Sequence, residues 1–169
     1  RNVDNPQRLE NLIIIINNLV NEYEKKCIFS LHPRTKKRLF DLKFKLDKKV
    51  KIMEPFGFTD YMKLQLNSYC VLSDSGTITE ESSIMNFRAI NIRQEHERPE
   101  GFEEGSVMFS DLEINRLKNI IQILEDQNED KNRNLKIPID YDVDNVSQKI
   151  IRIILSYTDY VNRNVWGKK

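Results

Sequence analysis

The chain has 169 residues, 39% of them hydrophobic, which is enough to bury the core of one domain. Its 27 Lys and Arg residues nearly balance its 26 Asp and Glu residues, and the net charge of +1 gives no electrostatic reason to expect nucleic acid or an anionic membrane as a partner. The aliphatic run from Leu12 to Ile16 is too short to span a bilayer and no signal-peptide pattern is present, so we expect a soluble protein.

Helical and strand-like patterns alternate along the chain. Asn5 followed by Pro6 is typical of a helix start, and the charged stretch from Gln127 to Tyr141 is expected to be a mobile connection. The predicted elements are, in order, a helix over 6–24, a strand over 27–31, a helix over 33–45, a strand over 50–53, a helix after the turn at 55–60, a strand over 69–72, a helix with apolar spacing from 78, strands over 89–92 and 106–109, and helices over 112–127 and 143–161.

Short apolar strands separated by helices predict a doubly wound α/β domain with a Rossmann-like parallel sheet. In such domains ligands bind beyond the carboxyl ends of the strands, near the point where the strand order reverses. The loops expected at that edge are 32–35, 55–61, 73–77 and 93–104.

The two cysteines indicate a reducing compartment. Cys27 and Cys70 each lie in an apolar, strand-like run, where a free thiol behaves as a small buried hydrophobe. Neither has a neighbour at metal-ligand spacing, and two such thiols do not suggest a disulfide framework. We therefore expect a cytoplasmic protein.

The loop between the strand at 69–72 and the helix from 78 has the composition of an anion site. Gly76 permits close backbone approach, and the hydroxyls of Ser75 and Thr77 add uncharged donors at the positive end of the helix dipole. Glu81, about one turn further along, is an acceptor suited to sugar hydroxyls. Ordinary helix capping by the same small residues is the alternative interpretation.

The charged loop after the strand at 89–92 is a second candidate. A run of this kind is usually a solvated surface loop. However, it returns to a strand at 106–109, so both of its ends lie at one sheet edge, and Arg98 is able to reach back over a bound phosphate.

The motifs together resemble the non-hydrolysing UDP-N-acetylglucosamine 2-epimerases over almost the whole chain. Four motifs carry the resemblance: His32-Pro33, the segment 54–61 (EPFGFTDY), Ser-Asp-Ser-Gly at 73–76 with Glu80-Glu81, and Glu-Arg-Pro-Glu at 97–100. The forms His-Pro-Arg-Thr and Phe-Gly-Phe-Thr-Asp-Tyr, with the ending at 159–163, look most like the branch that makes UDP-N-acetyl-L-fucosamine for capsule and O-antigen synthesis.

The resemblance implies an isomerase with the glycosyltransferase-B arrangement, in which two Rossmann-like domains face each other. Residues 1–169 match the C-terminal, UDP-binding domain, and 143–169 are expected to pack toward the other domain. In the family, UDP is eliminated to leave a glycal and re-adds after C2 has inverted, and the carboxylates that move the proton belong to the N-terminal domain. This fragment is therefore expected to be inactive alone. No cofactor and no metal is expected, and family members commonly form homodimers.

The resemblance also assigns nucleotide contacts. Ser75 matches the serine that holds the diphosphate, with backbone N–H groups from Gly76 and Thr77, although the family often has a second glycine where Thr77 stands. Glu81 matches the glutamate on the uridine ribose. Tyr61 matches the aromatic residue against the uracil, with helix packing as the alternative.

Three further residues complete the expected site. The backbone around Phe56 would read the edge of the base. Arg98 matches an arginine near the diphosphate, and His32 a histidine that faces the interdomain cleft; we predict catalytic roles for both. The alternatives are a surface ion pair for Arg98 and a strand-end cap for His32.

Two features leave the function open at this point. Family members carry His-Arg-x-Glu-Asn just before the first helix, whereas here only Asn2 remains and Arg1 replaces the Glu, so that histidine either lies upstream in a longer protein or has been lost. A glycosyltransferase of the same architecture and a non-catalytic sugar-nucleotide-binding module are the competing functions.

Overall fold

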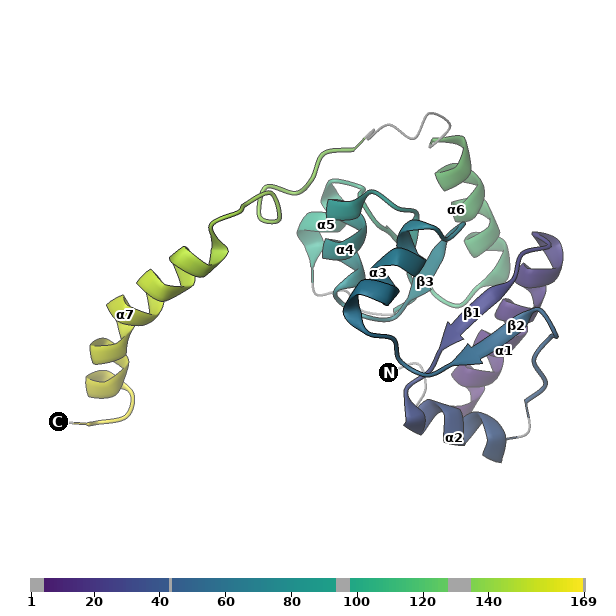
Figure 1. Cartoon of the computed structure of the whole chain (residues 1–169), viewed down its shortest axis with the longest axis horizontal. Helices are drawn as coiled ribbons and strands as arrows, with labels where there is room; N and C mark the ends of the chain where they lie inside the picture. The colour runs from purple at the N-terminus through teal and green to yellow at the C-terminus, as the bar shows by residue number, and fades with distance from the viewer. Residues whose placement is uncertain (1–4, 43, 94–97, 128–134, 169) are drawn as a thin grey trace. The chain divides into compact units, whose positions relative to one another are not determined.

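Helices and short strands alternate along the chain, and all but the last helix belong to one α/β unit (Figure 1). The computed structural model describes residues 5–42, 44–93, 98–127 and 135–168. The chain divides into two compact units, residues 1–138 and 139–169. The elements are α1 (Pro6–Glu22), β1 (Cys27–Ser30), α2 (Pro33–Asp41), β2 (Val50–Met53), α3 (Phe58–Leu66), β3 (Val71–Ser73), α4 (Ile78–Met85), β4 (Ala89–Asn91), α5 (Pro99–Glu103), β5 (Met108–Phe109), α6 (Ile114–Asp126) and α7 (Val146–Asn164).

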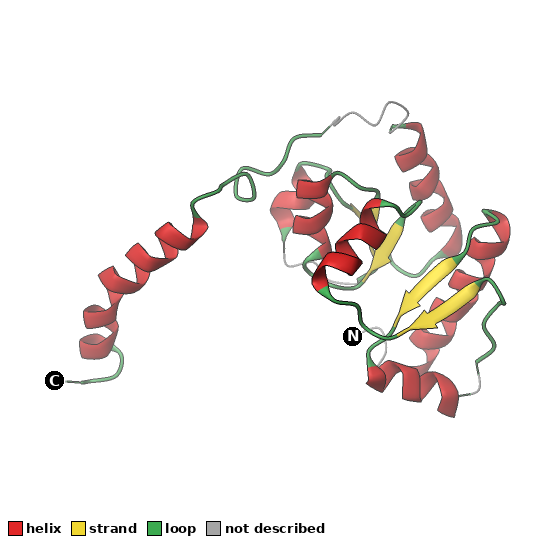
Figure 2. Ribbon diagram, viewed as in Figure 1, coloured by secondary structure: helices red, strands yellow, loops and turns green. Residues whose placement is uncertain are grey.

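The strands of the first unit form two parallel sheets, drawn in yellow in Figure 2. One sheet pairs β1 with β2, and the other has the order β3-β4-β5. The sequence predicted a single parallel sheet, whereas β1 and β3 are not paired with each other in the part of the chain that the structure describes. One hydrophobic core nevertheless includes Phe29 and Ile52 from the first sheet and Leu72 and Ile90 from the second. The two sheets therefore share their packing but not their backbone hydrogen bonds.

Helix α1 covers this core with one apolar face, as its spacing predicted. The Asn5 side chain accepts a hydrogen bond from the Gln7 amide at 2.9 Å. Pro6 lies in the first turn, where a backbone amide would have no acceptor within the helix, so its missing N–H costs no hydrogen bond. The buried residues recur at helical spacing: Leu9, Leu12, Ile13, Ile15, Ile16 and Val20. Helix α6 packs on the same core through Leu117, Ile120 and Ile121.

Helix α2 ends at Asp41, four residues before the predicted end at Lys45. Beyond it, Phe44 and Leu46 both pack against the core. Residues two apart lie on the same side of an extended chain but on different sides of a helix. Burial of this pair therefore explains why the helix is shorter than its composition suggested.

The loop 93–104 contains α5, which was not predicted, and its residues 94–97 lie outside the described part of the chain. Pro99 is the first residue of α5, where its fixed φ suits a helix start. The predicted mobile connection at 127–141 falls partly on 128–134, which are also outside it. Residues 1–4, which include the expected remnant Asn2, are outside it as well.

The two cysteines are free thiols whose side chains pack against the core, as expected. Burial raises the pKa of Cys70 to about 12, while the nearby Arg88 opposes that shift. Burial also raises the pKa of Cys27. Both groups are therefore protonated at neutral pH.

The second unit holds α7, which has no buried residue. Apolar side chains, among them Ile150, Ile154 and Tyr157, repeat at helical spacing and are exposed. Two aromatic residues near the end of the chain, Tyr160 and Trp166, are 55% and 63% exposed. No helix in the described ranges is both long and apolar enough to cross a membrane.

Adjacent isoleucines on α1 test where the core lies. Ile15 is 4% exposed and Ile14 is 51% exposed. Ile15→Ala is expected to lower the free energy of unfolding by about 2–5 kcal/mol, because it leaves a cavity, whereas Ile14→Ala should change it by less than about 0.5 kcal/mol. Urea unfolding of this chain measures both, and equal costs would contradict the assigned face of α1.

Candidate functional site

The loop between β3 and α4 presents hydroxyl groups at the start of the helix. The amide of Ser75 donates to Oγ of Ser73 at 3.1 Å, which tightens the turn. The hydroxyl oxygens of Ser75 and Thr77 lie 3.0 Å apart and hydrogen bond to each other. Both residues are exposed, so the pair stays accessible to a ligand.

The hydroxyl groups at this turn do not cap α4. Thr77 is the residue before the helix, but its backbone is helical, with φ −66° and ψ −12°, and its side chain makes no capping hydrogen bond. The capping interpretation is therefore wrong for Thr77. The backbone amides of Gly76, Thr77 and Ile78 have no protein acceptor within the described ranges. Such amides at a helix N-terminus are suited to bind an anion.

Arg98 lies over this turn. A β-carbon built on Gly76 would clash with the guanidinium and lie only 3.0 Å from its Cζ, so only glycine permits this approach. Nε of Arg98 donates to Oε1 of Glu80 in an ion pair that is about two-thirds buried. Arg98 is thus paired, as the alternative interpretation held, and it also lies against the predicted phosphate loop.

Small residues between α4 and α5 hold Arg98 in this place. Gly101 contacts the methyl group of Thr79 so closely that a β-carbon at 101 would overlap it. The hydroxyls of Ser83 and Ser106 hydrogen bond at 2.6 Å, and Ser106 also donates to the carbonyl of Gly101 at 3.1 Å. This contact fixes the start of α5, and with it Arg98, against α4.

A second group of side chains joins α4 to α3. Nε2 of Gln65 donates to Oε2 of Glu81 at 2.7 Å. Tyr61, one turn before Gln65 on α3, is half-buried. Burial raises its pKa, the Glu81 carboxylate raises it further, and hydrogen bonding to the side chains of Gln65 and Ser73 acts in the opposite direction. The Tyr61 phenol is therefore neutral at physiological pH, and the Glu81 carboxylate is near enough to raise its pKa electrostatically.

Phe56 and His32 lie in loops that follow the other sheet. Phe56 is half-buried in the turn between β2 and α3. His32 follows β1, and its carbonyl accepts from the amides of Thr35 at 2.9 Å and Lys36 at 3.1 Å, so its backbone begins α2. The His32 carbonyl therefore caps the start of α2, which leaves both interpretations of the His32 side chain as predictions, and the residue is exposed.

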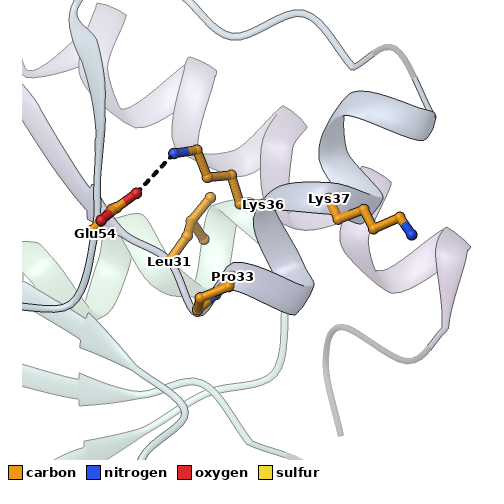
Figure 3. A pocket seen from close by; sticks show the side chains of 5 residues that line it. All are labelled: Leu31, Pro33, Lys36, Lys37 and Glu54. Atoms are coloured by element: carbon orange, nitrogen blue, oxygen red, sulfur yellow. Dashed lines mark hydrogen bonds and ion pairs between the residues drawn. The ribbon is translucent and has the colours of Figure 1, made fainter.

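A pocket lies beside His32, at the carboxyl ends of β1 and β2 (Figure 3). It is lined by Leu31, Pro33, Lys36, Lys37 and Glu54. Nζ of Lys36 lies 3.3 Å from Oε1 of Glu54, and Figure 3 shows Lys37 pointing away from that pair. The exposed pair contributes little to stability.

The structure thus brings most predicted residues to the two ends of one short segment. Gly76, between Ser75 and Thr77, lies against Arg98. Glu81, one turn later, hydrogen bonds to Gln65, which lies one turn after Tyr61 on α3. The first group offers N–H donors and a cation to an anion, and the second offers a carboxylate acceptor beside an aromatic ring. No group of three or more His, Cys, Asp or Glu side chains able to hold a metal occurs in the ranges that the structure covers.

Sequence reasoning missed two partners, Glu80 and Gln65. Glu80 was noted as part of a motif but received no role. Gln65 is a polar residue among the buried positions of α3, together with Met62. A glutamine in an apolar helix face was the signal that it has a polar partner.

A family model described as UDP-N-acetylglucosamine 2-epimerase matches residues 1–155. The chain belongs to this family. It is 38% identical over 163 residues to a UDP-N-acetylglucosamine 2-epimerase of Methanocaldococcus jannaschii, a match that covers 94% of this chain and 43% of that protein. The α/β fold class with parallel strands agrees with that of solved family structures.

Two of these structures show the likeness in three dimensions. UDP-N-acetylglucosamine 2-epimerase from Rickettsia bellii matches with a TM-score of 0.83 and 45% identity, over 95% of this chain and 44% of that chain. The M. jannaschii epimerase in complex with UDP-GlcNAc and UDP matches with a TM-score of 0.79 and 36% identity, over 92% and 42% of the two chains. The present chain spans less than half the length of the epimerases it matches.

Substitution of Gly76 tests the contact with Arg98. Gly76→Ala is expected to push the guanidinium aside without unfolding the loop, because the clash is with the end of a flexible side chain. Loss of the Arg98–Glu80 pair should lower the free energy of unfolding by about 0.5–1 kcal/mol. In an Arg98→Ala background the same change should cost nothing more, as a double-mutant cycle by urea unfolding would reveal. Equal costs in both backgrounds would place Arg98 away from Gly76.

Proposed function

We propose that this chain is the UDP-binding domain of a UDP-N-acetylhexosamine 2-epimerase, which inverts C2 of a UDP-2-acetamido sugar. The observation that carries the proposal is the Arg98 guanidinium against Gly76, at the N-terminus of α4. A cation, unpaired amides and two hydroxyls at one point match the needs of a diphosphate. Membership of the epimerase family supports the choice of reaction.

The nucleotide is proposed to lie along the start of α4. The diphosphate binds the Ser75 hydroxyl and the amides of Gly76 and Thr77, and Glu81 accepts from the ribose hydroxyls. The uracil lies against Tyr61, and the backbone around Phe56 reads its edge. The position of Tyr61 beside the Glu81 carboxylate supports this order, because uracil and ribose are adjacent in UDP.

Arg98 is proposed to assist departure of UDP. When the bond between C1 and the diphosphate breaks, negative charge grows on the leaving group, and a fixed guanidinium stabilises it. His32 is proposed to face the interdomain cleft, with a catalytic role. The C2 proton is moved by residues of a second, N-terminal domain, so residues 1–169 alone should bind UDP weakly and turn nothing over.

The remaining features of the whole protein follow from the same proposal. The enzyme is a cytoplasmic homodimer of the glycosyltransferase-B type, with 143–169 packed toward the N-terminal domain. The exposed apolar side of α7 supports that contact. The substrate belongs to the UDP-N-acetyl-L-fucosamine branch, and the product serves capsule or O-antigen polysaccharide, as the motifs at 32–35 and 56–61 suggest.

Solvent deuterium tests the reaction. The full-length polypeptide, incubated in D₂O with a UDP-2-acetamido sugar, is expected to place deuterium at C2 of the recovered sugar nucleotide, as NMR or mass spectrometry would show. Elimination and re-addition exchange that proton, whereas a glycosyltransferase and a binding module leave it untouched. Recovery without label, together with transfer of the sugar to an acceptor, would establish the glycosyltransferase instead.

Removal of the Glu81 carboxylate tests the ribose contact. Glu81→Ala in the full-length polypeptide is expected to weaken UDP binding by about 1–3 kcal/mol, because a charged hydrogen-bonding partner is lost. Isothermal titration calorimetry measures the affinity. Glu103→Ala, which removes an exposed carboxylate from α5, is the matched control and should bind UDP normally. Unchanged affinity in Glu81→Ala would remove the ribose assignment.

A further inference from the structure

Gln65 is a polar residue on the buried side of α3. It is only 2% exposed, and it shares the buried side of the helix with Met62. Its Nε2 donates to Oε2 of Glu81 at 2.7 Å. A carboxylate only accepts hydrogen bonds, so it is the amide nitrogen that must face Glu81.

This orientation costs the fold a hydrogen bond. With Nε2 directed at Glu81, the other end of the amide, Oε1, is buried without a hydrogen-bond partner in the described part of the chain. A buried acceptor left unsatisfied is destabilising, and an apolar side chain of similar length would fill the same space without that penalty. Stability of α3 therefore does not explain a glutamine here.

The location of Gln65 beside Glu81 accounts for a glutamine at this position. Gln65 lies one turn after Tyr61 on α3, and its side chain hydrogen bonds to Glu81 on α4. It therefore ties the Glu81 carboxylate to the helix that also carries Tyr61. The bond engages Oε2 of Glu81 and leaves Oε1, which receives no hydrogen bond from the described residues, to accept from a ligand.

We infer that Gln65 is a positioning residue, which fixes the Glu81 carboxylate so that its second oxygen meets a ribose hydroxyl of the bound nucleotide. The inference rests on the proposed function and adds a residue to which no role has been assigned. A glutamate side chain has many rotamers in water, and binding must otherwise order them. Holding the carboxylate in place before the nucleotide arrives removes that cost.

The experiment compares UDP with 2′-deoxy-UDP, which lacks one ribose hydroxyl. Both are titrated into the full-length polypeptide, as wild type and as Gln65→Met, a substitution of similar length with no donor. Wild type is expected to prefer UDP by about tenfold, corresponding to about 1.4 kcal/mol. Gln65→Met should lose most of that preference, with weaker UDP binding and nearly unchanged 2′-deoxy-UDP binding. A change that only disturbed α3 would weaken both nucleotides equally and would overturn the inference.

Two further variants of α3, Met62→Leu and Gln65→Glu, serve as the control and the second test. Met62→Leu alters the other buried residue of α3 without touching the hydrogen bond and should keep the wild-type preference. Gln65→Glu keeps the length of the side chain but replaces the donor with a second carboxylate, so it should also lose the preference. It serves as the second test if Gln65→Met does not fold, as judged by its thermal unfolding.

Substitution of Glu81 distinguishes the ribose contact from the role of Gln65. If Glu81→Gln loses the preference for UDP while both Gln65 variants keep it, the ribose contact stands and the role of Gln65 is wrong. If Glu81→Gln keeps the wild-type preference, the ribose contact in the proposed function is wrong, and the inference about Gln65 falls with it.

Discussion

The approach of the Arg98 guanidinium to Gly76 is the contact on which the rest of the site depends. It requires a residue without a β-carbon at position 76, because any other side chain would occupy the space of the guanidinium. It also requires α5 to pack closely on α4, which Gly101 allows by its contact with Thr79. Two glycines far apart in the sequence thus bring a cation to the start of a helix whose first amides, those of Gly76, Thr77 and Ile78, find no acceptor among the described residues.

Two adjacent glutamates on α4 bond to different helices, Glu80 to Arg98 at the start of α5 and Glu81 to Gln65 on α3. Glu80 pairs with Nε of Arg98, which orients the guanidinium and leaves its terminal nitrogens toward the loop. Glu81 turns to the other side and bonds to Gln65 on α3. Since the Glu80 carboxylate offsets the charge of Arg98, attraction for an anion must come largely from directed N–H groups and the helix dipole. Such a site selects by geometry more than by net charge, in keeping with the near-neutral composition of the chain.

Most of the fold was predictable because its signals are local. The Asn5 cap, the apolar spacing of α1 and the short apolar strands each depend on residues a few positions apart, and the structure confirms them. The predictions that failed depended on distant contacts. Helix α2 is shorter than predicted because Phe44 and Leu46 bury themselves in the core, and the predicted single sheet divides between β1 and β3 although one core spans both parts.

By itself, the sequence was sufficient to determine the family, the order of the helices and strands other than α5, and the loop at 73–77, because motif residues recur at fixed spacing along a chain. Only the tertiary structure decided which partner each polar side chain takes. Glu80 and Glu81 are adjacent residues of the same type, and their side chains bond to different helices: Glu80 to Arg98 at the start of α5, and Glu81 to Gln65 on α3. Hydrogen bonds form over about 3 Å, and which groups come that close is set by how the helices pack.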